Sequence, residues 1–187
     1  MKKAWPFLLI TINLLFALPL RGQHITIKSN LLYWATTTPN MGFEFRLGKK
    51  LSVDLWGAYN AWEFNNDMSL KHYLVQPELR YWPCQTFEGH FFGLHGHFGH
   101  FNMGNIPFIP GLKDMNYRGE LYGGGLTWGY HWVIGRHWGL EAFIGGGYAY
   151  MEYDKYVCYD CTEVIATYRR HYFGPTRAGV SLIFFIH

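Results

Sequence analysis

The sequence predicts an all-β protein, an eight-stranded antiparallel up-and-down β-barrel that crosses a membrane. Apolar and polar residues alternate with a period of two along much of the chain, as in pleated strands. Short connections alternate with longer ones, as in outer-membrane barrels. Aromatic residues make up 20% of the chain and charged residues only 16%, against about a quarter charged in ordinary soluble domains. We therefore expect the outer surface to face lipid.

The first 22 residues have the features of a secretory signal peptide. They begin with two lysines, continue with a largely apolar run at 7–18, and end at Leu20-Arg21-Gly22, a plausible cleavage point. The apolar run is too short for a comfortable membrane helix. We expect a cleaved signal peptide at 1–22 and an outer-membrane β-barrel domain at 23–187.

Loss of the signal peptide changes the charge balance. It would remove Lys2, Lys3 and Arg21 and no acid, so that the 16 Lys and Arg residues fall to 13, equal to the 13 Asp and Glu residues. Nucleic-acid binding depends on an excess of positive charge. We therefore expect no nucleic-acid partner for the neutral mature chain.

Eight runs have strand character, and no linker or low-complexity tract separates them. Most reach the 9–11 residues that a tilted strand needs to cross a bilayer. An even number of antiparallel strands can close into a barrel without an exposed edge. We place the strands at 24–35, 40–47, 51–60, 72–82, 89–102, 117–133, 137–153 and 171–186.

The connections sort by length onto two sides. If the first strand starts in the periplasm, the short periplasmic turns fall at 48–50, 83–88 and 134–136. The outer side then carries the segments 36–39, 61–71, 103–116 and 154–170, of which three are long. Short turns on one side and long loops on the other are typical of outer-membrane barrels.

Two of the turns also predict strand register. Residues directly opposite in a hairpin share a face, so an odd turn keeps two odd-numbered or two even-numbered apolar sets together. Gly48-Lys49-Lys50 and Ile134-Gly135-Arg136 are three residues long and meet this condition. The second turn predicts that Trp132 lies beside Trp138.

The ionisable residues of the strands share the face opposite to the apolar one. A Lys or Arg that faces the bilayer midplane costs roughly 2–4 kcal/mol, so we assign these residues to the barrel interior. Buried ions need partners, and an eight-stranded barrel is only wide enough for side chains to fill. We therefore expect a packed ionic network and not a wide pore. The network residues are Lys28, Glu44, Arg46, Asp54, Glu78, Arg80, Glu141 and Arg177.

Aromatic residues on the apolar face gather near the two predicted membrane surfaces, as aromatic girdles do. A soluble barrel with its apolar face inward is the rival fold, but its outer face would normally be rich in Lys, Glu and Asp. Here the polar face is rich in Gly, Thr, Asn, Gln and His instead. The predicted girdle residues are Tyr33, Tyr59, Tyr73, Tyr81, Trp132, Trp138, Tyr148, Tyr150, Tyr172 and Phe184.

Cysteine and histidine patterns offer possible chemistry. Cys158 and Cys161 form a C-x-x-C pair in the last outer loop; a disulfide clip is the simplest interpretation, and a redox motif or half a metal site are the alternatives. Cys84 lies at the periplasmic end and is too distant to pair with them. His95 and His97 share the inward face and could bind a transition metal, although polar packing explains them equally well. We expect no cofactor and assign no metal site.

An enzyme of outer-membrane lipids is the alternative function. A hydrolase or acyltransferase needs a nucleophile, a base and an orienting acid. Ser69 lies near His72 in the sequence, but no nucleophile-elbow pattern surrounds it. We therefore assign no catalytic residues.

Five segments of the chain carry a resemblance: NLLYWATTTPNMGFEF, HYLVQPELRYW, GHFFGLHGHFGHFN, YGGGLTWGYHWVIGRHWGLEAFIGGGYAYMEYDKY and YFGPTRAGVSLIFFI. Together they resemble a family of Bacteroidetes outer-membrane β-barrels of unknown function. The resemblance implies the outer membrane of a Gram-negative anaerobe and genes that often lie near fimbrial or surface-assembly genes. It implies no catalytic or ligand residues.

These observations together predict a small outer-membrane barrel with a structural or surface-interaction role. Lipid or lipopolysaccharide would surround the barrel. Loops on a rigid scaffold usually carry recognition, so we expect a surface protein or glycan to contact the outer segments 61–71, 103–116 and 154–170.

Overall fold

The computed structural model describes residues 25–64, 68–104, 115–157 and 163–186. The predicted signal peptide, Cys158 and Cys161 lie outside the described residues. In these residues the chain is all-β apart from one short helix, α2 (Leu31–Ala35). The strands are β1 (Ile25–Asn30), β2 (Asn40–Arg46), β3 (Leu51–Asn60), β4 (Glu63–Phe64), β5 (Met68–Tyr81), β6 (Gly89–Gly104), β7 (Asn116–Val133), β8 (Trp138–Tyr156) and β9 (Val164–Ile186).

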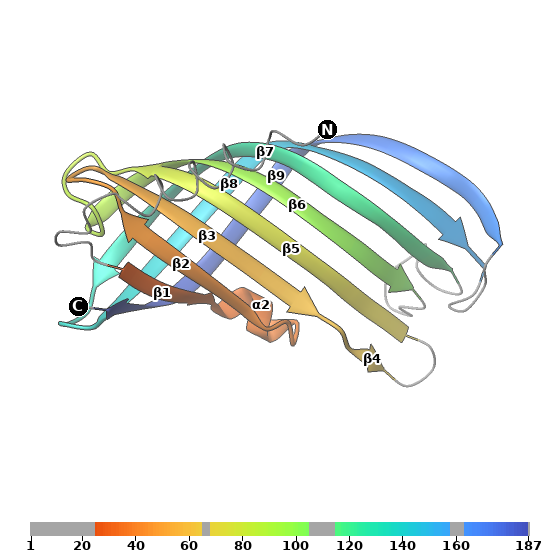
Figure 1. Cartoon of the computed structure of the whole chain (residues 1–187), viewed down its shortest axis with the longest axis horizontal. Helices are drawn as coiled ribbons and strands as arrows, with labels where there is room; N and C mark the ends of the chain where they lie inside the picture. The colour runs from red at the N-terminus through yellow and green to blue at the C-terminus, as the bar shows by residue number, and fades with distance from the viewer. Residues whose placement is uncertain (1–24, 65–67, 105–114, 158–162, 187) are drawn as a thin grey trace, which may run out of the picture.

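Eight of these strands form one ring-like antiparallel sheet (Figure 1). Neighbours in the sequence pair with each other, β1 pairs with β9, and β3 pairs directly with β5, so the ladder of hydrogen bonds closes. The two-residue β4 adds only to the edge of β5. The prediction of eight antiparallel strands is confirmed.

Among the described residues, no helix is both long enough and apolar enough to cross a membrane.

The two ends of the ring differ. The end with the short connections 47–50, 82–88 and 134–137 is the turn end, and the opposite end is the loop end. At the loop end β6–β9 run well beyond β1 and β2, so the rim of the ring is oblique (Figure 1). The parts of β7, β8 and β9 at 116–121, 151–156 and 164–170 form what we call the projecting sheet.

The first predicted strand is too long, because the chain turns into α2 after Asn30. The Asn30 side chain accepts a hydrogen bond from the Leu32 backbone N–H at 3.1 Å, which is a helix N-cap. The helix places the ring of Tyr33 4.6 Å from that of Trp56, a buried residue on the inward face of β3. The assignment of Tyr33 to an outward girdle was therefore wrong.

The predicted loop at 154–170 is mostly strand, because β8 runs to Tyr156 and β9 begins at Val164. A register shift in the β8–β9 pair changes the face of the outer part of β9: Gly145 pairs with Arg177, but Gly146 pairs with Pro175. Tyr172 consequently pairs with Ala149, a buried inward residue. It lies on the inner face and not in the outward girdle to which the alternation assigned it.

Of the two predicted turns, the structure confirms the strand register of one and shifts that of the other. Phe45 pairs with Val53, the register that a turn at 48–50 requires. In the other hairpin Trp132 pairs with Leu140, and the Ile134 N–H donates to the Trp138 carbonyl. The turn is therefore one residue later than predicted. Its length stays odd, so the faces are right, but the pairing of Trp132 with Trp138 was wrong.

Candidate functional site

Side chains fill the ring in three layers between the turn end and the loop end. The first is an aromatic plug, the second is an ionic network, and the third is a histidine–threonine layer. The residues of each layer come from several strands, so only closure of the ring brings them together.

The aromatic plug closes the turn end. It consists of the buried residues Trp82, Phe87, Phe91, Phe143, Ile183 and Phe185. The rings of Trp82 and Phe91 lie 5.0 Å apart, and those of Phe87 and Phe185 lie 5.8 Å apart. The Thr86 N–H donates to the Lys49 carbonyl at 3.0 Å, which ties the connection 82–88 across the end of the ring.

The ionic network lies directly above the plug. Seven of the eight predicted residues come together there, with side chains at most 3% exposed. They are Lys28 of β1, Glu44 of β2, Asp54 of β3, Glu78 and Arg80 of β5, Glu141 of β8 and Arg177 of β9. Four carboxylates therefore meet three cations.

Arg80 is the centre of this network. Its guanidinium lies 3.1 Å from Glu44, 3.1 Å from Asp54 and 2.7 Å from Glu141, and it also bonds Glu78 on its own strand. Glu44 is the cross-strand partner of Asp54, which is in turn the partner of Glu78. Like charges directly opposite each other repel. Arg80 offsets this repulsion because it contacts all three carboxylates.

Lys28 and Arg177 complete the pairing. Lys28 bonds Glu44 and lies 3.5 Å from Glu141. Arg177 lies 3.0 Å from Asp54 and 2.9 Å from Glu78. A buried ion without a partner costs several kcal/mol, and each charge of the network has at least one opposite charge within ion-pair distance.

Arg46 was predicted to belong to this network and does not. It is the last residue of β2, half-buried at the rim of the turn end, and its Nε donates to the Gly48 carbonyl at 3.1 Å. The alternation along β2 places Arg46 on the same inward face as Glu44, but β2 ends there and the side chain does not reach the carboxylates.

Glycines on the inward face make room for the larger side chains. A Cβ at Gly93 would collide with the carboxylate of Glu78, and one at Gly129 would collide with the ring of Phe91. These glycines are therefore needed for close approach.

His95 leads the third layer. Its Nδ1 lies 2.8 Å from the Thr127 hydroxyl and its Nε2 lies 2.9 Å from the Thr176 hydroxyl. The ring of His97 lies 5.8 Å away. No group of three or more His, Cys, Asp or Glu residues suited to a metal exists within the described residues. Cys84 is free and exposed at the turn end.

The remaining predicted girdle residues lie on the outward face. At the turn end they are Tyr81, Trp132, Trp138 and Phe184, all exposed, with the rings of the last two 5.1 Å apart. Toward the loop end Tyr59 pairs directly with Tyr73. Tyr150 contacts Tyr122 at 5.2 Å, and the Tyr148 hydroxyl lies 2.7 Å from His171 Nδ1.

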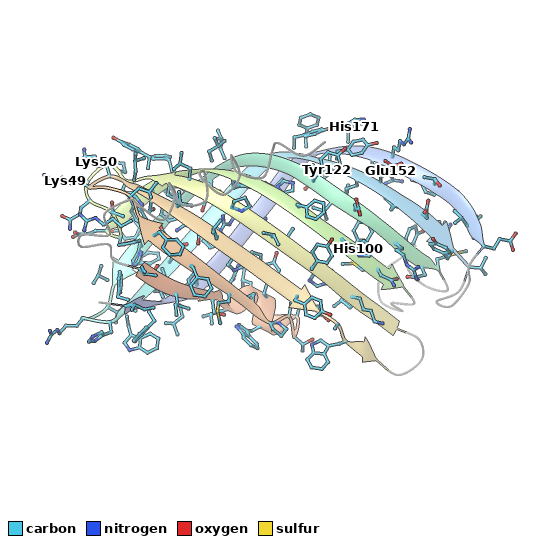
Figure 2. All side chains as sticks on the ribbon, in the orientation of Figure 1. Lys49, Lys50, His100, Tyr122, Glu152 and His171 are labelled. Carbon is cyan, nitrogen blue, oxygen red and sulfur yellow. The ribbon has the colours of Figure 1, made fainter. Side chains whose placement is uncertain are left out.

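The outward surface changes composition over three successive rows of paired residues near the loop end. Figure 2 labels Tyr122 and His171 of the first row and His100 and Glu152 of the second. The row nearest the turn end is apolar or aromatic: Val75, Phe98, Tyr122, Tyr150 and His171. The next row is mixed: Tyr73, His100, Glu120, Glu152 and Arg169. The last row is polar: Lys71, Asn102, Arg118, Asp154 and Thr167.

The projecting sheet has a different character on each face. On its outward face, Arg169 bonds Glu152 at 3.1 Å, and the Thr167 hydroxyl donates to Asp154 at 2.6 Å. The bond to Glu152 raises the pKa of the Arg169 guanidinium above its ordinary value. The inner face is aromatic, with Tyr153 between Tyr117 at 5.8 Å and Tyr168 at 5.5 Å.

Comparison with known families places the chain. A family described as "Protein of unknown function (DUF3575)" matches residues 7–186. The chain belongs to the DUF3575 family. The match spans every strand of the ring, so the plug, the ionic network and the projecting sheet all lie within the part that defines the family. A search of curated proteins found no match.

In this DUF3575 chain Ser69 and His72 are three residues apart on β5. His72 Nδ1 lies 3.3 Å from the Leu70 carbonyl.

The outer ends of β8 and β9, which lie within the predicted loop 154–170, are the part of the projecting sheet in this DUF3575 member that the sequence did not predict. Strands were predicted at 117–133 and 137–153, so the rest of the projecting sheet falls almost entirely within predicted strands. The alternation of polar outward and aromatic or apolar inward residues continues through Met151, Glu152, Tyr153 and Asp154, and this was the signal that β8 runs on.

Proposed function

We propose that the chain is a small transmembrane β-barrel of the outer membrane of a Gram-negative bacterium of the Bacteroidetes. Its role is structural or in surface interaction, and it is not a wide pore. The turn end would lie in the periplasm and the loop end outside, with outer-membrane lipid or lipopolysaccharide around the ring.

The change of composition across the three outward rows carries this proposal. The outward residues of β7 from Trp132 to Tyr122 are apolar, aromatic or glycine, and those from Glu120 onward are polar. That stretch is eleven residues long, which matches the 9–11 residues of a tilted strand in a bilayer. An exposed apolar band of this height, bounded by aromatic residues, is costly in water and favourable in lipid.

The filled interior supports a role other than a wide channel. Trp82, Phe91 and Ile183 have no exposed surface, and the ionic network lies directly above them. Solutes of appreciable size would have to displace paired ions and a packed aromatic layer, and both changes are expensive.

The loop end supports a contact role. The projecting sheet continues three strands of the ring and presents an ion pair on one face and tyrosines on the other. Tyrosine supplies large contact area at little entropic cost. Surface proteins or glycans are the partners that such a surface would suit.

Gel mobility with and without boiling, together with alkaline extraction of membranes, tests the location. We expect the unboiled protein to migrate faster and to remain in the membrane pellet. Identical migration combined with release by alkali would contradict a transmembrane barrel.

Site-specific photocrosslinking in cells tests the contact role. A crosslinker at Thr167 on the projecting sheet should capture a partner, whereas one at Leu126 in the apolar band should capture lipid. Crosslinks to protein or glycan from Leu126 but not from Thr167 would contradict the assignment.

A further inference from the structure

Two arginines at the turn end line one pocket and have no carboxylate partner among the described residues. We propose that this pocket binds a carboxylate group of a peptide through Arg46 and Arg136. This inference goes beyond the proposed surface role and does not depend on which partner the loop end contacts.

The pocket is small and lies at the mouth of the ring. Its volume is about 200 Å³, and Arg46, Arg136, Gln85 and Glu88 are among its polar lining residues. Phe87 and Phe185, the outermost residues of the aromatic plug, also line it. A ligand here would therefore contact polar groups from the turns and an apolar surface from the plug.

Hydrogen bonds between the turns hold this mouth in one arrangement. The Gly48 carbonyl accepts from Arg46 Nε at 3.1 Å and from the Thr86 hydroxyl at 2.8 Å. The Phe185 N–H donates to the His137 carbonyl at 2.9 Å. Because a guanidinium has five N–H donors and Arg46 uses only Nε in this contact, its terminal nitrogens remain for a ligand.

Charge at this end is unbalanced. Arg80 and Arg177 in the interior each contact two or more carboxylates, whereas no described carboxylate lies within 4.0 Å of Arg46 or Arg136. The three turn-end connections with Arg46 contain four Lys or Arg residues (Arg46, Lys49, Lys50 and Arg136) and one acid, Glu88. Lys49 and Lys50 lie at the same end of the molecule (Figure 2). The electrostatic potential therefore favours an anion.

The position favours a peptide carboxylate over a lipid phosphate. Phe87 and Phe185 belong to the inward side of the ring, whereas lipid headgroups would meet the outward face. Arginine recognises carboxylates through two parallel hydrogen bonds, and an aromatic floor suits the aliphatic part of an acidic residue. Cell-wall peptides and proteins both carry such carboxylates.

Calorimetric titration of the full chain, folded in detergent micelles, tests the site. The probe is a tripeptide that ends in glutamate with both carboxylates free, and its fully amidated form is the control ligand. We expect the free peptide to bind and the amidated peptide not to bind. Arg46→Gln and Arg136→Gln should each weaken binding about tenfold, as loss of a charge-assisted hydrogen bond does. The double variant should not bind measurably.

Arg170→Gln is the matched control, because Arg170 is an exposed arginine at the loop end; it should bind like the unaltered protein. Gel mobility shows whether each variant is folded, and Arg46→Lys keeps the charge if Arg46→Gln does not fold. Equal binding of the amidated peptide, or unchanged binding in the double variant, would overturn the proposal. Binding of inorganic phosphate as tightly as the peptide would also overturn it.

Sedimentation with insoluble cell-wall sacculi distinguishes the two sources of the carboxylate. Retention of the unaltered protein but not of the double variant assigns the ligand to the cell wall. Peptide binding without retention on sacculi assigns it to a protein chain.

Discussion

Arg80 in the ring interior and Arg169 on the projecting sheet make the same kind of contact in opposite surroundings. Each bonds a glutamate, at 2.7 Å for Arg80 with Glu141 and 3.1 Å for Arg169 with Glu152. The Arg80 side chain is 0% exposed, and that of Arg169 is 69% exposed. Water competes with the second pair and not with the first, so the distance alone says little about what each pair contributes.

The difference in exposure separates an ion pair that stabilises the ring from one that contributes little to its stability. Loss of one partner of a buried ion pair leaves an uncompensated charge in a medium of low dielectric constant. Loss of a partner on the projecting sheet leaves a charge that water solvates. Loss of a partner in the interior network should therefore destabilise the ring strongly, whereas loss of a partner on the projecting sheet should have little effect on stability.

Arg80→Leu should have the largest effect. The substitution leaves four carboxylates with only Lys28 and Arg177 as counter-ions. Removal of one partner of a buried ion pair typically costs about 3–5 kcal/mol, and we expect the free energy of unfolding to fall by at least this amount. Urea titration of the protein refolded into lipid vesicles, followed by gel mobility, measures the change. Arg80→Lys keeps the charge and should recover part of the loss. A stability like that of the unaltered chain would show that water reaches the network.

Trp82→Ala should be the next largest. The residue has no exposed surface and its Nε1 donates to the Ser52 hydroxyl at 2.8 Å, so the cavity should cost about 3–5 kcal/mol. Tyr153→Ala, which removes a partly exposed aromatic from the projecting sheet, is the matched change and should cost much less. Equal losses in the same urea titration would mean that the projecting sheet is as tightly packed as the plug.

The sequence predicts the face of a residue well where strand alternation alone decides it, and fails where a helix cap or a register shift interrupts the alternation. Alternation places Lys28, Arg80 and Glu141 inward because a single buried face sets the parity of a whole strand. It fails at Tyr33, where a local Asn30 cap begins a helix, and at Tyr172, where a one-residue register shift exchanges the faces.

The sequence does not predict which ions of the network pair with each other. Lys28 meets Glu44 on the neighbouring β2 but also Glu141 on β8, and Arg80 meets Glu141 across the ring. Only closure of the ring sets these contacts. Arg46 shows the complementary error: parity is right, but the position is too near the end of β2 to reach a partner.

Leu126→Arg compares the apolar band with the projecting sheet on one strand and one face. Leu126 is 67% exposed near the middle of the band, and an arginine there should cost about 2–4 kcal/mol in a bilayer. Glu120→Arg, six positions away on the same outward face of β7, should change stability little. If both variants unfold at the same urea concentration as the unaltered chain, the band does not face lipid.

Arg169→Gln should have the smallest effect. The exposed pair with Glu152 is screened by water and salt, so the urea midpoint should not change measurably. The pKa of Arg169 is raised above an already high value, and a raised pKa contributes stability that is lost only as the pH rises through it. The Arg169 guanidinium is therefore charged at any working pH, and added salt, rather than alkaline pH, should remove whatever the pair contributes. A clear loss of stability at low salt in this variant would place Arg169 in the same class as Arg80, and the contrast between the two regions would fail.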